Sequence, residues 1–340
     1  MLSYTVSILC LSLGSHACTN TIHADSILHP HHHVSQRLWP ARPLVFAQHA
    51  NTAFIKPLIM ISFTKMHGLG NDFMVIDATQ HPLTLSPQQI AHLSNRHTGI
   101  GFDQCLIVET STSPEVDFLY RIFNADGQEV GQCGNGARCL ARFVQARGLS
   151  SKQELCIQTL KTKMYLTLHD DETITVHFPQ PNLAPHLIPI QANQQETMYS
   201  LTIGQQTYSF HAINVGNPHA ILLANHWTDA DIATIGPQLS THPFFPEQTN
   251  VGFLSILSSH HLQLRVYERG CGETLACGSG AVAAAAIGQL YHNMTSDITV
   301  SLPGGDLQVS WPKRTGPLYL RGPATFVYEG NVWEAALCGS

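Results

Sequence analysis

The run Arg121-Ile-Phe-Asn-Ala-Asp-Gly-Gln-Glu-Val-Gly-Gln-Cys133-Gly-Asn-Gly-Ala137 returns later in the chain as Arg265-Val-Tyr-Glu-Arg-Gly-Cys-Gly-Glu-Thr-Leu-Ala-Cys277-Gly-Ser-Gly-Ala281. The two runs align without gaps at an offset of 144 residues, and six of their 17 positions are identical. A second pair, Gly70-Asn-Asp-Phe73 and Gly216-Asn-Pro-His219, lies at an offset of 146. This offset is too long for a solenoid repeat, so it predicts two similar domains, one beginning near residue 60 and the other near 180–205.

Each half of the chain is predicted to consist mainly of short strands. Helices are expected from Pro87 to about Arg96, after the N-cap Ser86, and from about Gly134 to Arg147. A third helix, from about Gly278 to Tyr291, is apolar nearly all round and should therefore lie in a core. Near-alternation of β-branched and aromatic residues predicts strands at 61–66, 73–79, 105–109, 116–123, 154–160, 164–168, 207–215, 219–224, 252–258, 262–267, 297–302 and 306–311. The expected fold class is α+β.

The composition narrows the class of protein. The chain has 340 residues and is 44% hydrophobic, enough for the cores of two moderate domains. Its net charge of -6 and only 12% charged residues argue against a nucleic-acid-binding protein. No apolar run approaches the ~20 residues of a membrane span. The nine cysteines are odd in number and irregularly spaced, which favours reduced thiols in a cytoplasmic enzyme over a disulfide scaffold.

Residues 1–59 differ from the rest of the chain. They contain a single acidic residue, Asp25, and seven histidines, including His31-His32-His33. Their short apolar stretch, Val6 to Leu13, is not preceded by a basic residue, so a secretory signal is disfavoured. The low acid content leaves a transit peptide as an alternative. We interpret 1–59 as an extension, disordered or outside a functional chain that starts at Met60.

Each repeat places Cys-Gly-x-Gly-Ala at a predicted helix start. Free N–H groups and the helix dipole stabilise a thiolate there, so we expect lowered pKa values for Cys133 and Cys277. The adjacent glycines let an anion approach the N–H groups. A carboxylate held between the two helix starts would have its α-carbon between two sulfurs. One thiolate would remove the α-proton, the opposite thiol would protonate the other face, and the helix dipoles would stabilise the enediolate.

Other interpretations of the cysteines are less favoured. A lone cysteine is usually a small buried hydrophobic residue, but two at matching repeat positions with matching glycines point to chemistry. Cys139 and Cys271 create two C-x5-C pairs, whereas structural zinc sites favour C-x2–4-C spacing. The sequence shows neither a lysine-anchored pyridoxal motif nor a metal-ligand cluster, so we expect no cofactor and no metal.

Over about residues 60–330 the chain closely resembles the diaminopimelate epimerase family, whose short motifs occur in the same order. These motifs are Met66-His-Gly-Leu-Gly-Asn-Asp-Phe73, Gly99-Ile-Gly-Phe-Asp-Gln104, Arg121-Ile-Phe-Asn-Ala-Asp-Gly127, Gln132-Cys-Gly-Asn-Gly-Ala-Arg138, Gly216-Asn-Pro-His219, Thr249-Asn-Val-Gly-Phe253, Val266-Tyr-Glu-Arg-Gly270 and Ala276-Cys-Gly-Ser-Gly280.

The resemblance implies two pseudo-symmetric domains, each a mainly antiparallel strand barrel around a central helix. The N-terminal domain would comprise 60–178 plus 323–340, and the C-terminal domain 179–322. The implied activity is pyridoxal-independent interconversion of LL- and meso-diaminopimelate, for lysine and peptidoglycan precursors. The resemblance also implies a homodimer.

Site residues follow from the resemblance position by position. Cys133 and Cys277 match the acid/base pair, and His219 and Glu268 match residues that tune them. For His219 a purely structural role is an equal alternative, whereas Glu268 stands where the first repeat has Asn124 and so breaks the symmetry. The reacting carboxylate would be held by Gly134, Asn135, Gly278 and Ser279. The remaining substrate contacts would be Asn71, Gln104, Asn124, Asn217, Asn250, Glu268 and Arg269.

Two rival functions remain open. A proline or hydroxyproline racemase, or a phenazine-type isomerase, would share the fold but differ at the distal contacts, and Asn217, Asn250 and Arg269 favour diaminopimelate. A non-catalytic binding protein or a redox switch is the rival of another class. Binding alone requires neither cysteine, which argues against a binding protein.

Overall fold

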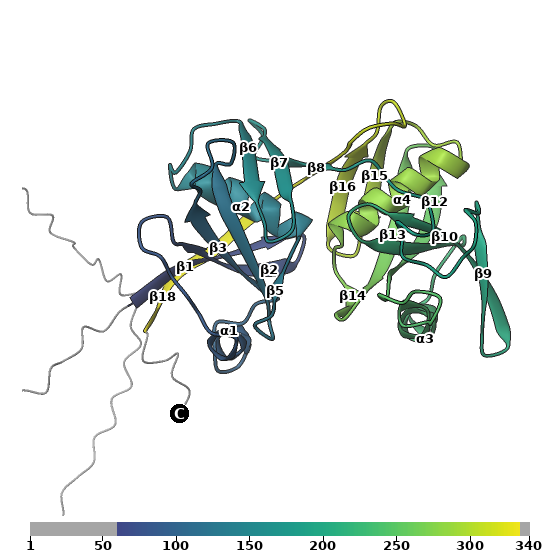
Figure 1. The fold of residues 1–340 in the computed structure, drawn as a ribbon, viewed down its shortest axis with the longest axis horizontal. Helices are drawn as coiled ribbons and strands as arrows, with labels where there is room; N and C mark the ends of the chain where they lie inside the picture. Colours follow the sequence, from purple (N-terminus) through teal and green to yellow (C-terminus); the bar gives the residue numbers. More distant parts are fainter. Residues whose placement is uncertain (1–59, 334–340) are drawn as a thin grey trace, which may run out of the picture. The chain divides into compact units, whose positions relative to one another are not determined.

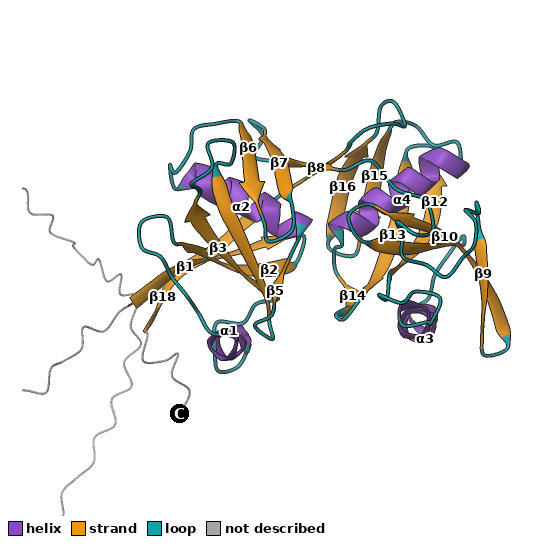
Figure 2. Cartoon of the chain, in the orientation of Figure 1, coloured by secondary structure: helices purple, strands orange, loops and turns teal. Residues whose placement is uncertain are grey.

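Strands dominate the computed structural model, which describes residues 60–333 (Figure 2). The first half contains β1 (Met60–Gly68), β2 (Asn71–Asp77), β3 (Gln104–Thr110), β4 (Phe118–Asn124), β5 (Glu129–Val130), β6 (Glu154–Gln158), β7 (Lys163–Leu168) and β8 (Ile174–Phe178). The second contains β9 (Tyr199–Ile203), β10 (Gln206–Asn214), β11 (Pro218–Leu223), β12 (Asn250–Ser258), β13 (His261–Glu268), β14 (Gly272–Thr274), β15 (Asp297–Leu302), β16 (Gly305–Ser310), β17 (Leu318–Gly322) and β18 (Thr325–Trp333). The extension predicted at 1–59 lies outside the described residues.

The helices are α1 (Pro87–Ser94), α2 (Gly134–Ala146), α3 (Asp229–Ser240) and α4 (Gly278–Tyr291). The predicted cap of α1 is confirmed, because the Ser86 hydroxyl accepts from Gln89 N–H and the Gln89 side chain accepts from Ser86 N–H. In residues 60–333 no helix combines the length and the apolar character that crossing a membrane requires.

Strand pairing repeats between the two halves. In the first half, β1 and β2 are antiparallel, β2 and β3 parallel, β3 and β4 antiparallel, and β4 and β6 parallel. The pairs β10–β11, β11–β12, β12–β13 and β13–β15 follow the same senses in the second half. Each half also places one long helix directly after a short strand, α2 after β5 and α4 after β14 (Figure 1). The predicted α+β fold of two pseudo-symmetric halves is confirmed.

Both long helices are buried among strands. Helix α4 contacts β10 to β13 and β15 to β17, and its residues from Gly280 to Gln289 are all buried. A run of alanines leaves little side chain on this helix, so the strands approach it closely. Helix α2 contacts β1, β2, β3, β7 and β8 and buries Leu140, Phe143 and Val144. The prediction of an apolar core helix is confirmed at α4.

The last strands pair with strands of the first half. β17 pairs with β16 and also with β8, and β18 pairs antiparallel with β1. Pairing of β18 with β1 agrees with the expected return of the chain end. The exact domain boundaries at 178–179 and 322–323 stay a prediction.

One helix and several strands were not predicted from the sequence. Helix α3 contains Gly236 and Pro237, residues that normally end a helix, yet a capping box of Thr228 and Asp231 starts it. That Thr-x-x-Asp spacing is the signal from which α3 could have been predicted. Strands β5, β8, β9, β14, β17 and β18 were also missed. The pairing of β18 with β1 and of β17 with β8 joins segments far apart in the sequence, whereas β9 forms a local hairpin with β10.

Candidate active site

Both cysteines of the repeat are helix N-caps, as predicted. Cys133 precedes α2 with extended backbone, and its Sγ accepts a hydrogen bond from Gly136 N–H at 3.3 Å. Cys277 precedes α4 in the same way and is almost fully buried. A sulfur at an N-cap faces the free N–H groups of the first helical turn, where negative charge is stabilised.

The starts of α2 and α4 are in contact. Asn135 Nδ2 donates to the carbonyl of Ala276 at 2.9 Å. A Cβ on Gly278 would lie 3.3 Å from Asn135 Oδ1, so only glycine fits there without displacement. Asn135 of the first cysteine motif therefore ties together two segments that are about 140 residues apart in the sequence.

Close packing against β4 explains why the first cysteine motif has a glycine at position 136. A Cβ at this position would lie 2.2 Å from Oη of Tyr120, a buried residue on β4. The absent side chain thus lets the first turn of α2 pack against β4. This packing fixes the N–H group that points at Cys133 Sγ.

A carboxylate stands beside the second cysteine. The Cys277 thiol donates to Glu268 Oε2 at 3.1 Å, and the Thr274 hydroxyl donates to Glu268 Oε1 at 2.5 Å. Burial raises the pKa of Glu268, and hydrogen bonds from Thr274 and Cys277 oppose that rise. Glu268 is therefore held against Cys277 by a residue that the sequence analysis did not single out.

A histidine and an asparagine meet at Ser279, on the other side of Cys277. Asn217 Nδ2 donates to Ser279 Oγ at 3.2 Å, and His219 Nε2 lies 3.1 Å from both Asn217 Oδ1 and Ser279 Oγ. Because an amide oxygen only accepts, we assign the ring proton of His219 to Nε2. Burial, with a smaller contribution from the Arg269 charge, lowers the pKa of His219 to about 3. The ring is consequently neutral near neutral pH.

His219 should make stability depend on pH. Its folded pKa of about 3 lies below the ordinary 6.5, so the unfolded chain binds the extra proton first. Stability is therefore complete above pH 6.5 and falls as pH drops towards 3. We expect His219→Gln to reduce the stability lost between pH 7.5 and pH 4 by up to about 3 kcal/mol.

The measurement is urea unfolding of wild type and His219→Gln at both pH values. Burial raises the pKa of Asp72, but Arg96 and Lys65 lower it to about 2. This carboxylate contributes the same pH dependence of stability in both proteins, so its effect cancels in the comparison. Equal stability losses in the two proteins would contradict the buried neutral state of His219.

The other predicted substrate contacts lie in hydrogen-bonded pairs. Gln104 Nε2 donates to Asn124 Oδ1 at 2.8 Å across β3 and β4. Asn250 Oδ1 accepts from Arg269 N–H at 3.0 Å, and the exposed Arg269 guanidinium donates to the carbonyl of Glu247 at 2.7 Å.

Asn71 is hydrogen-bonded to the start of α2. Its Oδ1 accepts from Asn135 at 3.2 Å, and its Nδ2 donates to Asp103 at 2.9 Å. Gly134 is the first residue of α2, and a Cβ there would lie 3.2 Å from the ring of Phe178. Hydrogen bonds thus connect Asn71 with Asn135, and Cys277 with Glu268, Ser279, Asn217 and His219. Gln104–Asn124 and Asn250–Arg269 form separate pairs.

Most of these site residues in one half of the chain have a counterpart in the other half, as the strand registers show. Phe73 stands opposite Gln104 on the parallel pair β2–β3, as His219 stands opposite Asn250 on β11–β12. The remaining matched positions are Asn71 with Asn217, Asn124 with Glu268, and Asn135 with Ser279. His219 and Glu268 are therefore ionisable residues near the second cysteine that stand where the first half has Phe73 and Asn124.

One expectation about the cysteines is wrong for the protein without substrate. Burial raises the pKa of Cys133 to about 11, although Gly136 N–H and the Arg138 charge act in the opposite direction. Burial and the Glu268 carboxylate raise the pKa of Cys277 well above its usual value. The helix start does favour the thiolate, as predicted, but desolvation is the larger effect.

The start of β2, which carries Asn71, is supported by an ion-pair network that was not predicted from the sequence. Arg96 forms a bidentate pair with Asp72 at 2.8 and 2.9 Å and contacts Asp103 at 2.8 Å. The buried Lys65 also pairs with Asp72, at 2.5 Å. Asp103 lies inside a motif quoted above and was given no role, yet it positions the Asn71 amide.

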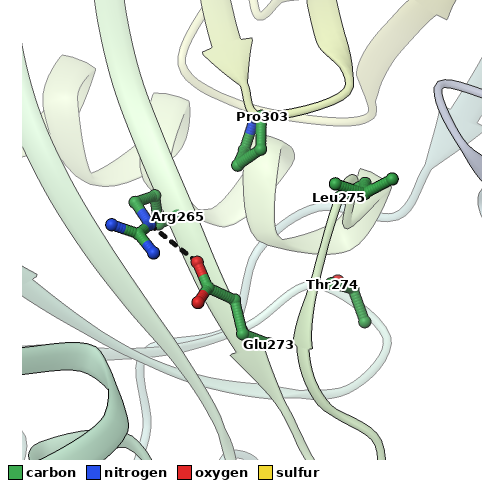
Figure 3. A pocket seen from close by; sticks show the side chains of 5 residues that line it. All are labelled: Arg265, Glu273, Thr274, Leu275 and Pro303. Carbon is green, nitrogen blue, oxygen red and sulfur yellow. Dashed lines mark hydrogen bonds and ion pairs between the residues drawn. The ribbon is translucent and has the colours of Figure 1, made fainter. Parts of the chain in front are cut away.

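A hollow of about 500 Å³ lies beside the β13–β14 hairpin (Figure 3). It is lined by Arg265, Glu273, Thr274, Leu275 and Pro303, and Arg265 Nε pairs with Glu273 at 2.6 Å. Thr274 connects the hollow to Glu268. None of the predicted site residues is among those that line the hollow.

Similarity to known proteins decides the family. The family model described as diaminopimelate epimerase matches residues 63–183 and 211–327. The chain belongs to the diaminopimelate epimerase family. Diaminopimelate epimerases of Legionella pneumophila, strains Philadelphia 1 and Corby, are each 55% identical over 273 residues, covering 80% of this chain and 99% of the relative.

Solved structures with low sequence identity share the fold of this family. A phenazine biosynthesis protein of the PhzF family from Bacillus anthracis superposes with a TM-score of 0.58 at 16% identity, covering 81% of this chain and 99% of its own. A hydroxyproline epimerase from Agrobacterium vitis gives a TM-score of 0.58 at 12% identity, over 81% and 93% of the two chains. These likenesses confirm the predicted fold class.

Proposed function

We propose that this chain interconverts LL- and meso-2,6-diaminopimelate by two-base proton transfer between Cys133 and Cys277, without a cofactor. One observation carries the proposal: the two cysteines cap two helices whose starts are joined by the hydrogen bond from Asn135 to Ala276. Family membership gives the substrate and the reaction class. The reaction provides precursors for lysine and peptidoglycan.

The reacting carboxylate is bound by the two helix starts. Gly134 and Gly278 bring no side chain between an anion and the N–H groups, and Asn135 and Ser279 offer polar groups beside them. Removal of the α-proton moves negative charge onto this carboxylate, which becomes an enediolate. Fixed N–H donors and two helix dipoles stabilise that charge where it develops.

The proton transfers need one thiolate and one thiol. The thiolate takes the α-proton from one face, and the opposite S–H protonates the other face, which inverts the centre. Each turnover leaves the two cysteines with exchanged protonation states. Glu268 accepts from the Cys277 thiol, so it is placed to hold the proton when Cys277 acts as a base.

The distal end of the substrate carries a carboxylate and an ammonium. The Arg269 guanidinium complements the carboxylate, and amide oxygens of the asparagines can accept from the ammonium. These contacts are Asn71, Gln104, Asn124, Asn217, Asn250, Glu268 and Arg269. A proline or hydroxyproline racemase of the same fold would have no second carboxylate to bind, which is why Arg269 favours diaminopimelate.

The proposal is tested by incubating the reduced protein with LL-diaminopimelate in D₂O, without any added cofactor. We expect loss of the α-proton signal by NMR together with the meso isomer on chiral chromatography. No exchange and no meso product would overturn the proposal. Turnover of proline or hydroxyproline under the same conditions would identify the same-fold alternative.

We also propose that the protein is a cytoplasmic homodimer. Among the described residues β18 pairs only with β1, and it exposes Phe326, Val327, Tyr328 and Trp333. An edge strand with exposed apolar side chains readily pairs with another chain, and a second copy of this chain would cover it.

Charges on β18 should separate the two copies. We expect wild type to sediment as a dimer, and a protein with Val327→Lys and Tyr328→Lys to sediment as a monomer, because lysine blocks pairing at a strand edge. Leu257→Lys is the matched control, since Leu257 is equally exposed, at 53%, on β12. A dimeric double variant would show that β18 is not the interface.

A further inference from the structure

Arg138 is a cation enclosed in the protein interior. It lies in α2, five residues after Cys133, and is 0% exposed. Its Nε donates to the carbonyl of Pro323 at 3.1 Å, whereas Nη1 and Nη2 find no hydrogen-bond partner in the described part of the chain. An arginine keeps its proton in such a place, although burial lowers the pKa of Arg138. The interior therefore holds a positive charge that no described carboxylate neutralises.

The guanidinium lies where the two helix starts meet. A Cβ on Gly278, the first residue of α4, would be 3.9 Å from Nη1, and one on Gly68 of β1 would be 3.1 Å from Nη2. On the opposite side, a Cβ on Gly322 would be 3.3 Å from Nε. Arg138 thus borders α4 as well as its own helix, directly behind the proposed carboxylate cradle.

The second repeat has no such charge. Val282 occupies the matching position, five residues after Cys277, and is also fully buried. Beside Cys277 stands the Glu268 carboxylate instead, where the first repeat has the neutral Asn124. The buried cation follows Cys133 on α2 and also borders Gly278, whereas the carboxylate is hydrogen-bonded, of the two cysteines, to Cys277 alone, so this asymmetry favours negative charge on Cys133 over Cys277.

We propose that Arg138 is a positioning residue whose fixed positive charge stabilises the thiolate of Cys133 and the carboxylate bound between the helix starts. A buried unpaired cation destabilises a fold, so a purely structural role would not explain it. An anion nearby recovers that cost, because charges interact strongly in a medium of low dielectric constant. The carboxylate part rests on the proposed function, whereas the effect on Cys133 needs no substrate.

Several groups act on Cys133, and one of them is a cation. They are Glu268 on β13, Tyr120 on β4, and Arg138 and Cys139 on α2. Arg138 is the cation in this set, so a change of its charge should change the alkylation rate of Cys133. It is measured with iodoacetamide on the reduced, substrate-free protein from pH 7 to pH 10, with peptide mass spectrometry resolving Cys133.

We expect Arg138→Met to slow alkylation of Cys133 at least fivefold at pH 8 and to shift its pH profile upward. In Arg138→Lys, which keeps the charge, the alkylation rate of Cys133 should stay within twofold of wild type. Arg142→Met is the matched control on the same helix, because Arg142 pairs with the exposed Glu172, and it too should stay within twofold. The urea midpoint of Arg138→Met should be no lower than that of wild type. Where Arg138→Met does not fold, Arg138→Gln provides the uncharged variant.

If Cys133 of the uncharged variant is alkylated at the wild-type rate, the inference is overturned. Slow alkylation of Cys133 in Arg138→Lys would also overturn it. In the epimerase assay, kcat/KM of Arg138→Met should fall at least tenfold. If wild type fails to epimerise diaminopimelate while Arg138→Met still alkylates slowly, the proposed function fails and the role of Arg138 stands. If wild type epimerises normally while alkylation of Arg138→Met is unchanged, the proposed function stands and the role of Arg138 fails.

Discussion

Cys133→Ala and Cys277→Ala should each lower kcat/KM for epimerisation by at least about a thousandfold, roughly 4 kcal/mol of barrier. In a two-base mechanism each cysteine is the only group that can reach its face of the α-carbon. Each sulfur also sits at a helix N-cap. The measurement is the rate of meso product formation from LL-diaminopimelate.

Cys271→Ala provides the matched control for the cysteine variants. Cys271 is exposed and lies six residues before Cys277, so its loss should leave turnover within twofold. Solvent exchange adds a second readout. A variant that exchanges the α-proton of one stereoisomer without inverting it identifies the remaining cysteine as the base for that isomer. Near-normal epimerisation by either alanine variant would contradict the assignment of Cys133 and Cys277 as the two bases.

Glu268→Gln should lower kcat/KM at least about a hundredfold, or close to 3 kcal/mol. Its carboxylate accepts from the Cys277 thiol at 3.1 Å and is held by Thr274, so it is placed to take and return that proton. A glutamine has nearly the same shape but cannot take the proton. The variant would also make this position neutral, as Asn124 is in the first half.

The pH dependence distinguishes this role from simple packing. Burial raises the pKa of Glu268, so the acid limb of the kcat/KM profile should lie above the usual range of a carboxyl group and should change in Glu268→Gln. Glu273→Gln is the control on the same hairpin, because Glu273 pairs with Arg265 at 2.6 Å. We expect the control to stay within threefold of wild type. A Glu268→Gln enzyme with an unchanged profile would show that Glu268 is no proton carrier.

Much of the site could be predicted because its signals are local in the sequence. Helix starts are set by the capping residue and the turn that follows it, which is why both cysteines fall at the predicted N-caps. The capping box of Ser86 and Gln89 was predicted for the same reason. The equivalent box of Thr228 and Asp231 carried the same signal, but the glycine and proline later in α3 obscured it.

Other features could not be predicted because they depend on residues that meet only in the folded chain. Desolvation of Cys133 and Cys277 comes from the packing of the folded chain around them, and it reverses the pKa shift expected from the helix start alone. Thr274 was overlooked because its hydrogen bond to Glu268 requires the β13–β14 hairpin. The pairing of β18 with β1 joins residues 258 to 273 positions apart in the sequence.

The sequence by itself determined the repeat, the two cysteine motifs at helix starts and the family. Helix capping, periodicity and short motifs depend on residues that are close together in the sequence. The tertiary structure alone decided which charges surround each sulfur. It placed the Arg138 guanidinium against the start of α4 and the Glu268 carboxylate against Cys277. The physical reason is that burial and Coulomb interactions depend on distances through space, which are fixed only when both halves of the chain have folded.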